Sequence, residues 1–128
     1  MNEPTAGAKK VLIIEDEKRL ADALEIKFRH EGFNVIKAEN GQTGLELIIS
    51  QNPNVVLLDL MMPVMDGKTM LKKLREFPQF KNLPVIVLTN AGDVDNMRET
   101  QLYYNANAFL IKSNTSPDQI VAKVKELT

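Results

Sequence analysis

The chain alternates short apolar, β-branched segments with longer stretches, and this alternation restricts the fold more than any other feature. Five such segments follow one another: KKVLIIE, FNVIKA, NVVLLD, LPVIVLT and AFLIK. Each interval is long enough for a helix, and strands that alternate with helices are typical of a parallel sheet with right-handed crossovers. The pattern predicts an α/β fold, a doubly wound five-stranded parallel sheet with helices on both faces.

Apolar residues at helical spacing predict where the helices lie. Leu20, Leu24 and Phe28 form one stripe that ends at Gly32. A second helix is expected before Pro53, with a buried stripe of Gly41, Gly44, Leu45, Ile48 and Ile49. A third stripe consists of Gly67, Met70, Leu71 and Leu74 and is broken near Pro78, and a ragged fourth one covers Val94 to Tyr104.

The last helix carries the clearest start signal in the chain. Ser116 is placed to cap it, Pro117 stands at the first helical position and Gln119 completes a capping box. Its apolar stripe consists of Ile120, Val121, Val124 and Leu127. We therefore expect a helix that runs from Pro117 to the end of the chain.

Length and composition restrict the class of protein. With 128 residues, 44% of them hydrophobic, we expect one domain over residues 9–128 behind a flexible tail of residues 1–8. Sixteen Lys and Arg against seventeen Asp and Glu leave no basic footprint for direct nucleic-acid binding. The absence of Cys excludes thiol chemistry, and no apolar run suits a signal peptide or a membrane span. We expect a cytoplasmic protein without a membrane partner.

A carboxylate follows the most apolar of the five segments. Val55 to Leu58 indicate a strand buried on both faces, and Asp59 comes directly after them in VVLLDLMMPVMDG. Burying an unpaired carboxylate is costly, so we expect Asp59 to reach the surface where the strand ends. In a parallel sheet, ligands bind at that edge, which makes Asp59 a candidate functional residue.

Other polar residues stand at the same ends of the predicted strands. They are Glu15, Asp16, Thr89 and Lys112. Carboxylates that approach one another in a partly dry site repel, so they take up a proton or bind a cation. Oxygen ligands alone favour Mg²⁺. Asp59 is then available as a nucleophile toward phosphorus, with Lys112 as a positive charge and the Thr89 hydroxyl as a hydrogen-bond donor.

These residues, in this order, resemble the receiver domain of two-component response regulators. The resemblance rests on Glu15-Asp16, DLMMPVMDG around Asp59, Thr89, and FLIK ending at Lys112, and it extends from about Lys10 to the C-terminus. It implies a flavodoxin-like (βα)₅ sandwich with strand order 2-1-3-4-5. It also implies a phosphorylated signalling protein rather than a classical enzyme.

The resemblance assigns a role to each site residue. Asp59 would accept a phosphoryl group from a phosphohistidine of a sensor histidine kinase or a histidine phosphotransfer protein. Mg²⁺ would be bound by Asp16, Asp59 and the carbonyl of Met61, with Glu15 acting mainly through water. Thr89 and Phe109 would form the switch that changes the face made by the fourth helix, the fifth strand and the fifth helix. The domain would act as a monomer or as a phosphorylation-linked dimer.

Two of the departures from the family pattern concern the backbone, besides Asn90, which stands where a small residue is usual, and Phe109, which has no hydroxyl. Lys112 is followed by Ser113 where the family usually has a proline after a cis peptide bond, so the bond is either trans or strained. Asn105 stands where the family prefers Gly after the fourth helix, and Asn is the next best residue in a left-handed cap.

Rival functions differ in what they require of the sequence. A phosphatase with an aspartate nucleophile needs a second Asp two residues after Asp59, where this chain has Met61. Glycine-rich nucleotide-binding loops are absent after the first strand. A receiver-like interaction module that works without phosphorylation stays open as the alternative.

Overall fold

The structure is a computed structural model that describes residues 7–90, 98 and 104–128. The elements in chain order are β1 (Lys10–Ile14), α1 (Lys18–His30), β2 (Asn34–Ala38), α2 (Gly41–Gln51), β3 (Val55–Asp59), α3 (Gly67–Arg75), η1 (Pro78–Phe80), β4 (Val85–Thr89), β5 (Ala108–Ile111), η2 (Lys112–Asn114) and α5 (Pro117–Leu127). Apart from Arg98 and Tyr104, the predicted fourth helix falls outside the described residues, as do residues 1–6 of the predicted tail.

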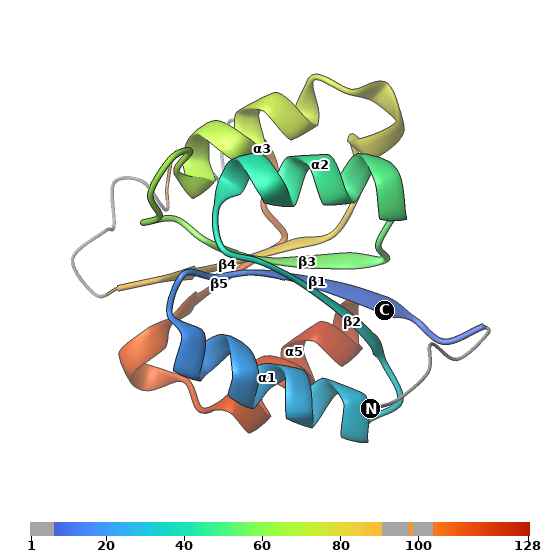
Figure 1. Cartoon of the computed structure of the whole chain (residues 1–128), viewed down its shortest axis with the longest axis vertical. Helices are drawn as coiled ribbons and strands as arrows, with labels where there is room; N and C mark the ends of the chain where they lie inside the picture. Colours follow the sequence, from blue (N-terminus) through green and yellow to red (C-terminus); the bar gives the residue numbers. More distant parts are fainter. Residues whose placement is uncertain (1–6, 91–97, 99–103) are drawn as a thin grey trace.

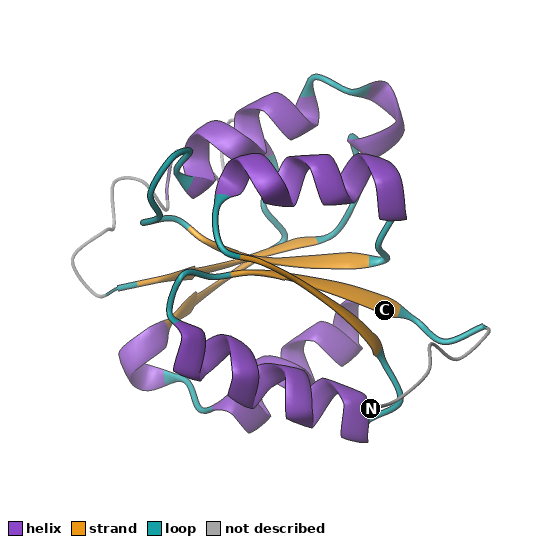
Figure 2. Cartoon of the chain, viewed as in Figure 1, coloured by secondary structure: helices purple, strands orange, loops and turns teal. Residues whose placement is uncertain are grey.

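The strands form one parallel sheet in the order β2-β1-β3-β4-β5. Helices α1 and α5 cover one face and α2 and α3 the other (Figure 1). The sheet twists between these two helical layers (Figure 2). The predicted fold class and strand order are confirmed.

Side chains on the central strands alternate between two cores. Val11 and Ile13 of β1 pack on the side of α1 and α5, whereas Leu12 and Ile14 pack on the side of α2 and α3. The same alternation runs along β3 and β4, whose residues are all buried. This is why those strands read as continuous apolar runs.

Local signals start and stop the helices where the sequence predicts. The Ser116 hydroxyl accepts a hydrogen bond from the Gln119 N–H, and the Gln119 side chain accepts one from the Ser116 N–H, so the capping box is confirmed. Gly32, just after α1, has a φ of 90°, a conformation that glycine adopts without strain.

One predicted core position is wrong. Ile49 was expected on the buried stripe of α2, but it is 51% exposed. Gly44 and Ile48 face the sheet, and a residue one position after Ile48 is rotated about 100° around the helix axis, toward solvent.

No helix within the described parts of the chain combines the length and apolar character needed to cross a membrane.

Candidate functional site

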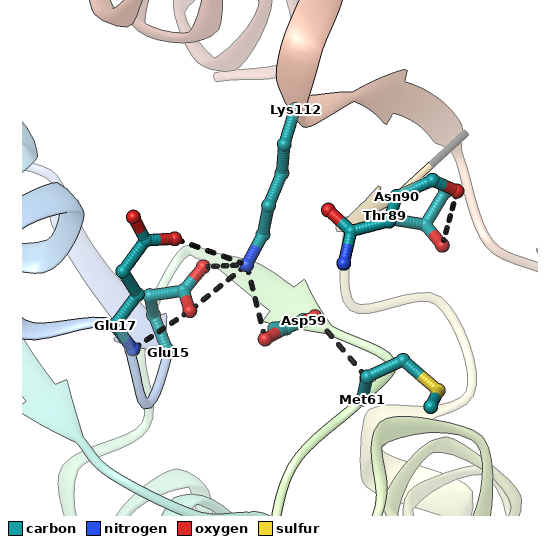
Figure 3. Close-up of polar contacts among 7 residues, drawn as sticks. All are labelled: Glu15, Glu17, Asp59, Met61, Thr89, Asn90 and Lys112. Atoms are coloured by element: carbon teal, nitrogen blue, oxygen red, sulfur yellow. Dashed lines mark hydrogen bonds and ion pairs between the residues drawn. The ribbon is translucent and has the colours of Figure 1, made fainter. Parts of the chain in front are cut away.

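The ends of three strands bring opposite charges together at one edge of the sheet. Lys112 follows β5, and its Nζ donates hydrogen bonds to Glu15 Oε2 at 3.0 Å and to Asp59 Oδ2 at 3.1 Å. Glu15 follows β1, and Asp59 is the last residue of β3. Figure 3 shows the lysine side chain pointing between the two carboxylates. The three residues are far apart in sequence and meet only because β1, β3 and β5 are parallel.

A third carboxylate completes an acidic cluster. Glu15, Asp16 and Asp59 each offer an oxygen, and these oxygens lie within 4.8 Å of one another. Glu15 and Asp59 are buried, whereas Asp16 is exposed and gives the cluster an open side. Glu15 Oε1 lies 2.7 Å from Lys112 Nζ as an ion pair but accepts no hydrogen bond from the described residues. The cluster therefore holds more negative charge than the single Lys112 ammonium balances.

Asp59 is buried, and the expectation that it reaches the surface is wrong. Its side chain is 3% exposed. Besides the contact with Lys112, its Oδ1 accepts a hydrogen bond from the Met61 N–H at 3.1 Å. The expectation assumed an unpaired carboxylate, and these partners, contributed by the folded chain, offset part of the desolvation cost.

Burial sets the ionisation of the cluster. It raises the pKa of Glu15 to about 7, against the opposing effects of the hydrogen bonds from Lys112 and the Glu17 N–H. Burial also raises the pKa of Asp59, although the Lys112 charge and the Met61 N–H favour its ionised form. Burial by itself would lower the pKa of Lys112, but Glu15 and Asp59 outweigh it and raise that pKa. The lysine stays charged, and a proton or another cation is favoured on the carboxylates.

The two predicted switch residues lie on neighbouring strands. Thr89 ends β4 and is fully buried beside Asn90, whose carbonyl accepts a hydrogen bond from the Thr89 hydroxyl at 3.4 Å (Figure 3). Phe109, on β5, is half-buried and packs against the core on the side of α2 and α3. Phe109 pairs in register with Val87, two residues before Thr89 on β4. The sheet thus places Thr89 on the strand next to Asp59 and Phe109 on the strand beyond it.

The two backbone departures from the family pattern have a definite conformation. No peptide bond in the described ranges is cis, so Lys112 and Ser113 are joined by a trans bond. Asn105 has a φ of 54°, which confirms the predicted left-handed conformation.

Sequence reasoning missed Glu17 as a member of the site. Its Oε2 lies 3.8 Å from Lys112 Nζ, and its N–H donates to Glu15 Oε2 at 3.0 Å. The sequence did contain a signal for this role, because Glu17 is a third acidic residue, two positions after Glu15 in the same turn. A glutamate before a helix is also an ordinary favourable charge at the N-terminus, and that interpretation needs no site.

The comparisons with known proteins place the chain in a family. The response regulator receiver domain family matches residues 11–125. The chain therefore belongs to the response regulator receiver domains, the signalling modules of two-component systems.

Similar proteins share the whole fold at moderate identity. Transcriptional regulatory protein SrrA of Staphylococcus aureus is 37% identical over 118 residues, which are 92% of this chain and 47% of that protein. This chain spans about half the length of the curated relatives it matches. A putative response regulator from Chloroflexus aurantiacus is 31% identical, with a TM-score of 0.83 and coverage of 94% and 97%. The response regulator TrrA of Thermotoga maritima, solved with Mg²⁺-BeF, is 27% identical, with a TM-score of 0.79 and coverage of 94% and 99%.

Proposed function

We propose that this domain accepts a phosphoryl group on Asp59 from a phosphohistidine, in a Mg²⁺-dependent reaction. The observation that carries the proposal is the cluster itself: a buried carboxylate at the end of β3, held by one lysine and crowded by two further carboxylates. Such an excess of buried negative charge destabilises the folded state, and a bound cation would relieve it.

The chain's own residues fit a magnesium ion. The cluster offers hard oxygen ligands, one side of it is open at Asp16, and Lys112 alone does not balance its three carboxylates. Asp16, Asp59 and the Met61 carbonyl would hold the ion, with Glu15 acting through water. When bound, Mg²⁺ supplies charge that offsets the repulsion among the carboxylates and the negative charge of a phosphoryl group.

The proposed reaction is a simple exchange of bonds at phosphorus. An Asp59 carboxylate oxygen attacks, an O–P bond forms, the P–N bond of the phosphohistidine breaks, and its electron pair stays on the imidazole nitrogen. Lys112 Nζ, 3.1 Å from Asp59 Oδ2, contributes positive charge next to the phosphoryl oxygens. Thr89 would donate its hydroxyl to one of these oxygens.

The signal would be a shift between two populations. The phosphoryl group adds charge and acceptor oxygens beside Thr89, and the favoured state is the one in which Thr89 and Phe109 have moved. Phe109 has no hydroxyl, so its part depends on packing. The face that includes β5 and α5 would then bind a different partner.

Beryllofluoride, which mimics an acyl phosphate, tests the proposal against the alternative of a phosphorylation-independent module. We expect calorimetry to show saturable, Mg²⁺-dependent binding to the wild type and none to Asp59→Asn. Asp66→Asn is the matched control, because Asp66 caps α3 in the same loop and Asn caps as well. Absence of binding to the wild type would favour the module instead.

The partners and setting of the domain follow the same proposal. A sensor histidine kinase or a histidine phosphotransfer protein would be the donor, in the cytoplasm, and the domain would be a monomer or a phosphorylation-linked dimer. Light scattering with and without beryllofluoride distinguishes the two states. The SrrA relative is named a transcriptional regulator and is about twice this length, and the proposal includes no direct nucleic-acid contact of this domain.

A further inference from the structure

The loop after Asp59 contains a backbone turn that its sequence does not favour. Val64 has a φ of 68°, and the Met65 N–H donates a hydrogen bond to the Pro63 carbonyl at 2.8 Å. A three-residue turn with a positive φ at its centre is rare and strained. A β-branched residue in this conformation is an outlier, since its side chain clashes with its own backbone.

Contacts on both sides hold the turn in place. The Met65 carbonyl accepts a hydrogen bond at 3.1 Å from the N–H of Gly41, at the start of α2. The Gly67 N–H donates to the Leu60 carbonyl at 3.0 Å, and a Cβ at Gly67 would collide with the Asp59 carbonyl. The backbone path is therefore set by α2 and β3, and Val64 has to adopt it.

Packing of the Val64 side chain does little to offset this strain. It is 83% exposed. Met61, three residues earlier in the same loop, is 57% exposed. These two are the most exposed large apolar residues of the loop that carries Asp59, and a residue kept in a strained conformation without packing points to a role outside the fold.

A phosphoryl donor has to pass this loop. Asp59 is almost fully buried, so a donor imidazole reaches it only by coming down over the rim of the site. The Met61 N–H binds Asp59 directly, which places that residue on the rim. A small phosphodonor needs no contact with the loop surface, whereas a protein that presents a phosphohistidine has to cover its surroundings.

We infer that the exposed side chains of Met61 and Val64 form an apolar contact for the phosphohistidine-bearing protein, and that Val64 contributes to the choice of donor. The inference rests on the proposed function and adds the partner's chemistry: apolar side chains beside the phosphohistidine. Val64 would be a specificity residue that does not touch the reacting atoms.

Replacing Val64 separates recognition from stability. Val64→Gly removes the side chain and the strain together, so we expect a higher melting temperature. For the donor we would use the kinase fragment that transfers fastest to the wild type in a panel. With it we expect kcat/KM for transfer to fall about tenfold, mainly through KM. Phosphorylation by phosphoramidate, a small donor, should stay within about twofold of wild type.

Two further variants sharpen the test. Val64→Asn introduces a residue that tolerates a positive φ and replaces the apolar side chain by a polar one. Its kcat/KM for transfer from the kinase should fall in the same way. Ile49→Asn removes another exposed apolar side chain, at the end of α2 away from this loop, and it should leave transfer unchanged.

The outcomes separate cleanly. Unchanged transfer from the kinase to Val64→Gly would overturn the inference, and so would an equal fall with phosphoramidate, which would assign the effect to the site itself. Self-association of the wild type that Val64→Gly abolishes, with transfer intact, would assign the patch to a second copy of the chain. A wild type that neither a kinase fragment nor phosphoramidate phosphorylates would defeat the proposed function first.

Discussion

Two parts of this molecule bury charged side chains, and the two differ in how far hydrogen bonds and opposite charges compensate that burial. At the end of α3, the half-buried guanidinium of Arg75 donates to the carbonyls of Tyr104 at 2.9 Å, Phe80 at 2.7 Å and Asn105 at 2.9 Å. At the edge of the sheet, Glu15 and Asp59 share the single ammonium of Lys112, and Glu15 Oε1 accepts no hydrogen bond from the described residues.

The difference indicates what each charge is for. Arg75 uses its fork of donors on backbone carbonyls, and it joins α3 to η1 and to the segment that precedes β5, so its charge serves the fold. The acidic cluster has more negative charge than its one lysine balances, so its folded state is poised to bind a proton or a cation. We interpret Arg75 as structural and the cluster as chemical.

The largest expected effect on stability comes from Arg75. Arg75→Met removes three hydrogen bonds that the guanidinium donates to backbone carbonyls, so we expect the free energy of unfolding to fall by about 3 kcal/mol. Urea denaturation measures it. Arg75→Lys, which keeps the charge but not the fork, should lose less. Beryllofluoride binding to the folded fraction should persist, and its loss would break the distinction between the two regions.

Magnesium should act only on the acidic cluster. At pH 8, Mg²⁺ at about thirty times its dissociation constant should raise the free energy of unfolding by about 2 kcal/mol, because the ion binds the folded state alone. Asp16→Asn should remove most of this gain. Asp22→Asn, an aspartate of α1 outside the cluster, should keep it, and an equal gain in both variants would contradict a specific site.

The ionisation of Glu15 should produce a smaller, pH-dependent effect in the metal-free protein. Its folded pKa of about 7 lies above the ordinary 4.5, so the folded state binds more protons between these values, and stability falls as pH rises through that window. Because water reaches part of the site, we expect about 1 kcal/mol. Urea midpoints from pH 4.5 to 8 should fall more steeply in the wild type than in Glu15→Gln, which keeps only the contribution of the other groups.

The smallest effect is expected at the exposed ion pairs between α1 and α5. Lys27 pairs with Asp118 at 2.8 Å, and Lys125 pairs with Glu31 at 2.7 Å. Water and salt screen such contacts, so Asp118→Asn should leave the urea midpoint unchanged within error, even at low salt. A clear loss would show that charge pairing at the surface matters here as much as pairing in the interior.

Local patterns along the chain were enough for most of the architecture. The continuous apolar run Val55–Leu58 indicated a strand buried on both faces, and the capping box at Ser116 marked the start of α5. The positions of Glu15, Asp59 and Lys112 at strand ends were sufficient to expect a shared site, since parallel strands end at one edge. These features depend on neighbours within a few residues or on topology alone.

Other features were decided only by contacts between distant segments. The burial of Asp59 depends on Lys112, 53 residues away, and the three carbonyls bound by Arg75 come from two different connections. The turn at Val64 is imposed by Gly41, which a pattern of residues around Val64 does not reveal. Local periodicity determines which face of an element is apolar. Which side chains share a buried space depends on how the elements pack, because the energies of burial, pairing and strain arise only once they are together.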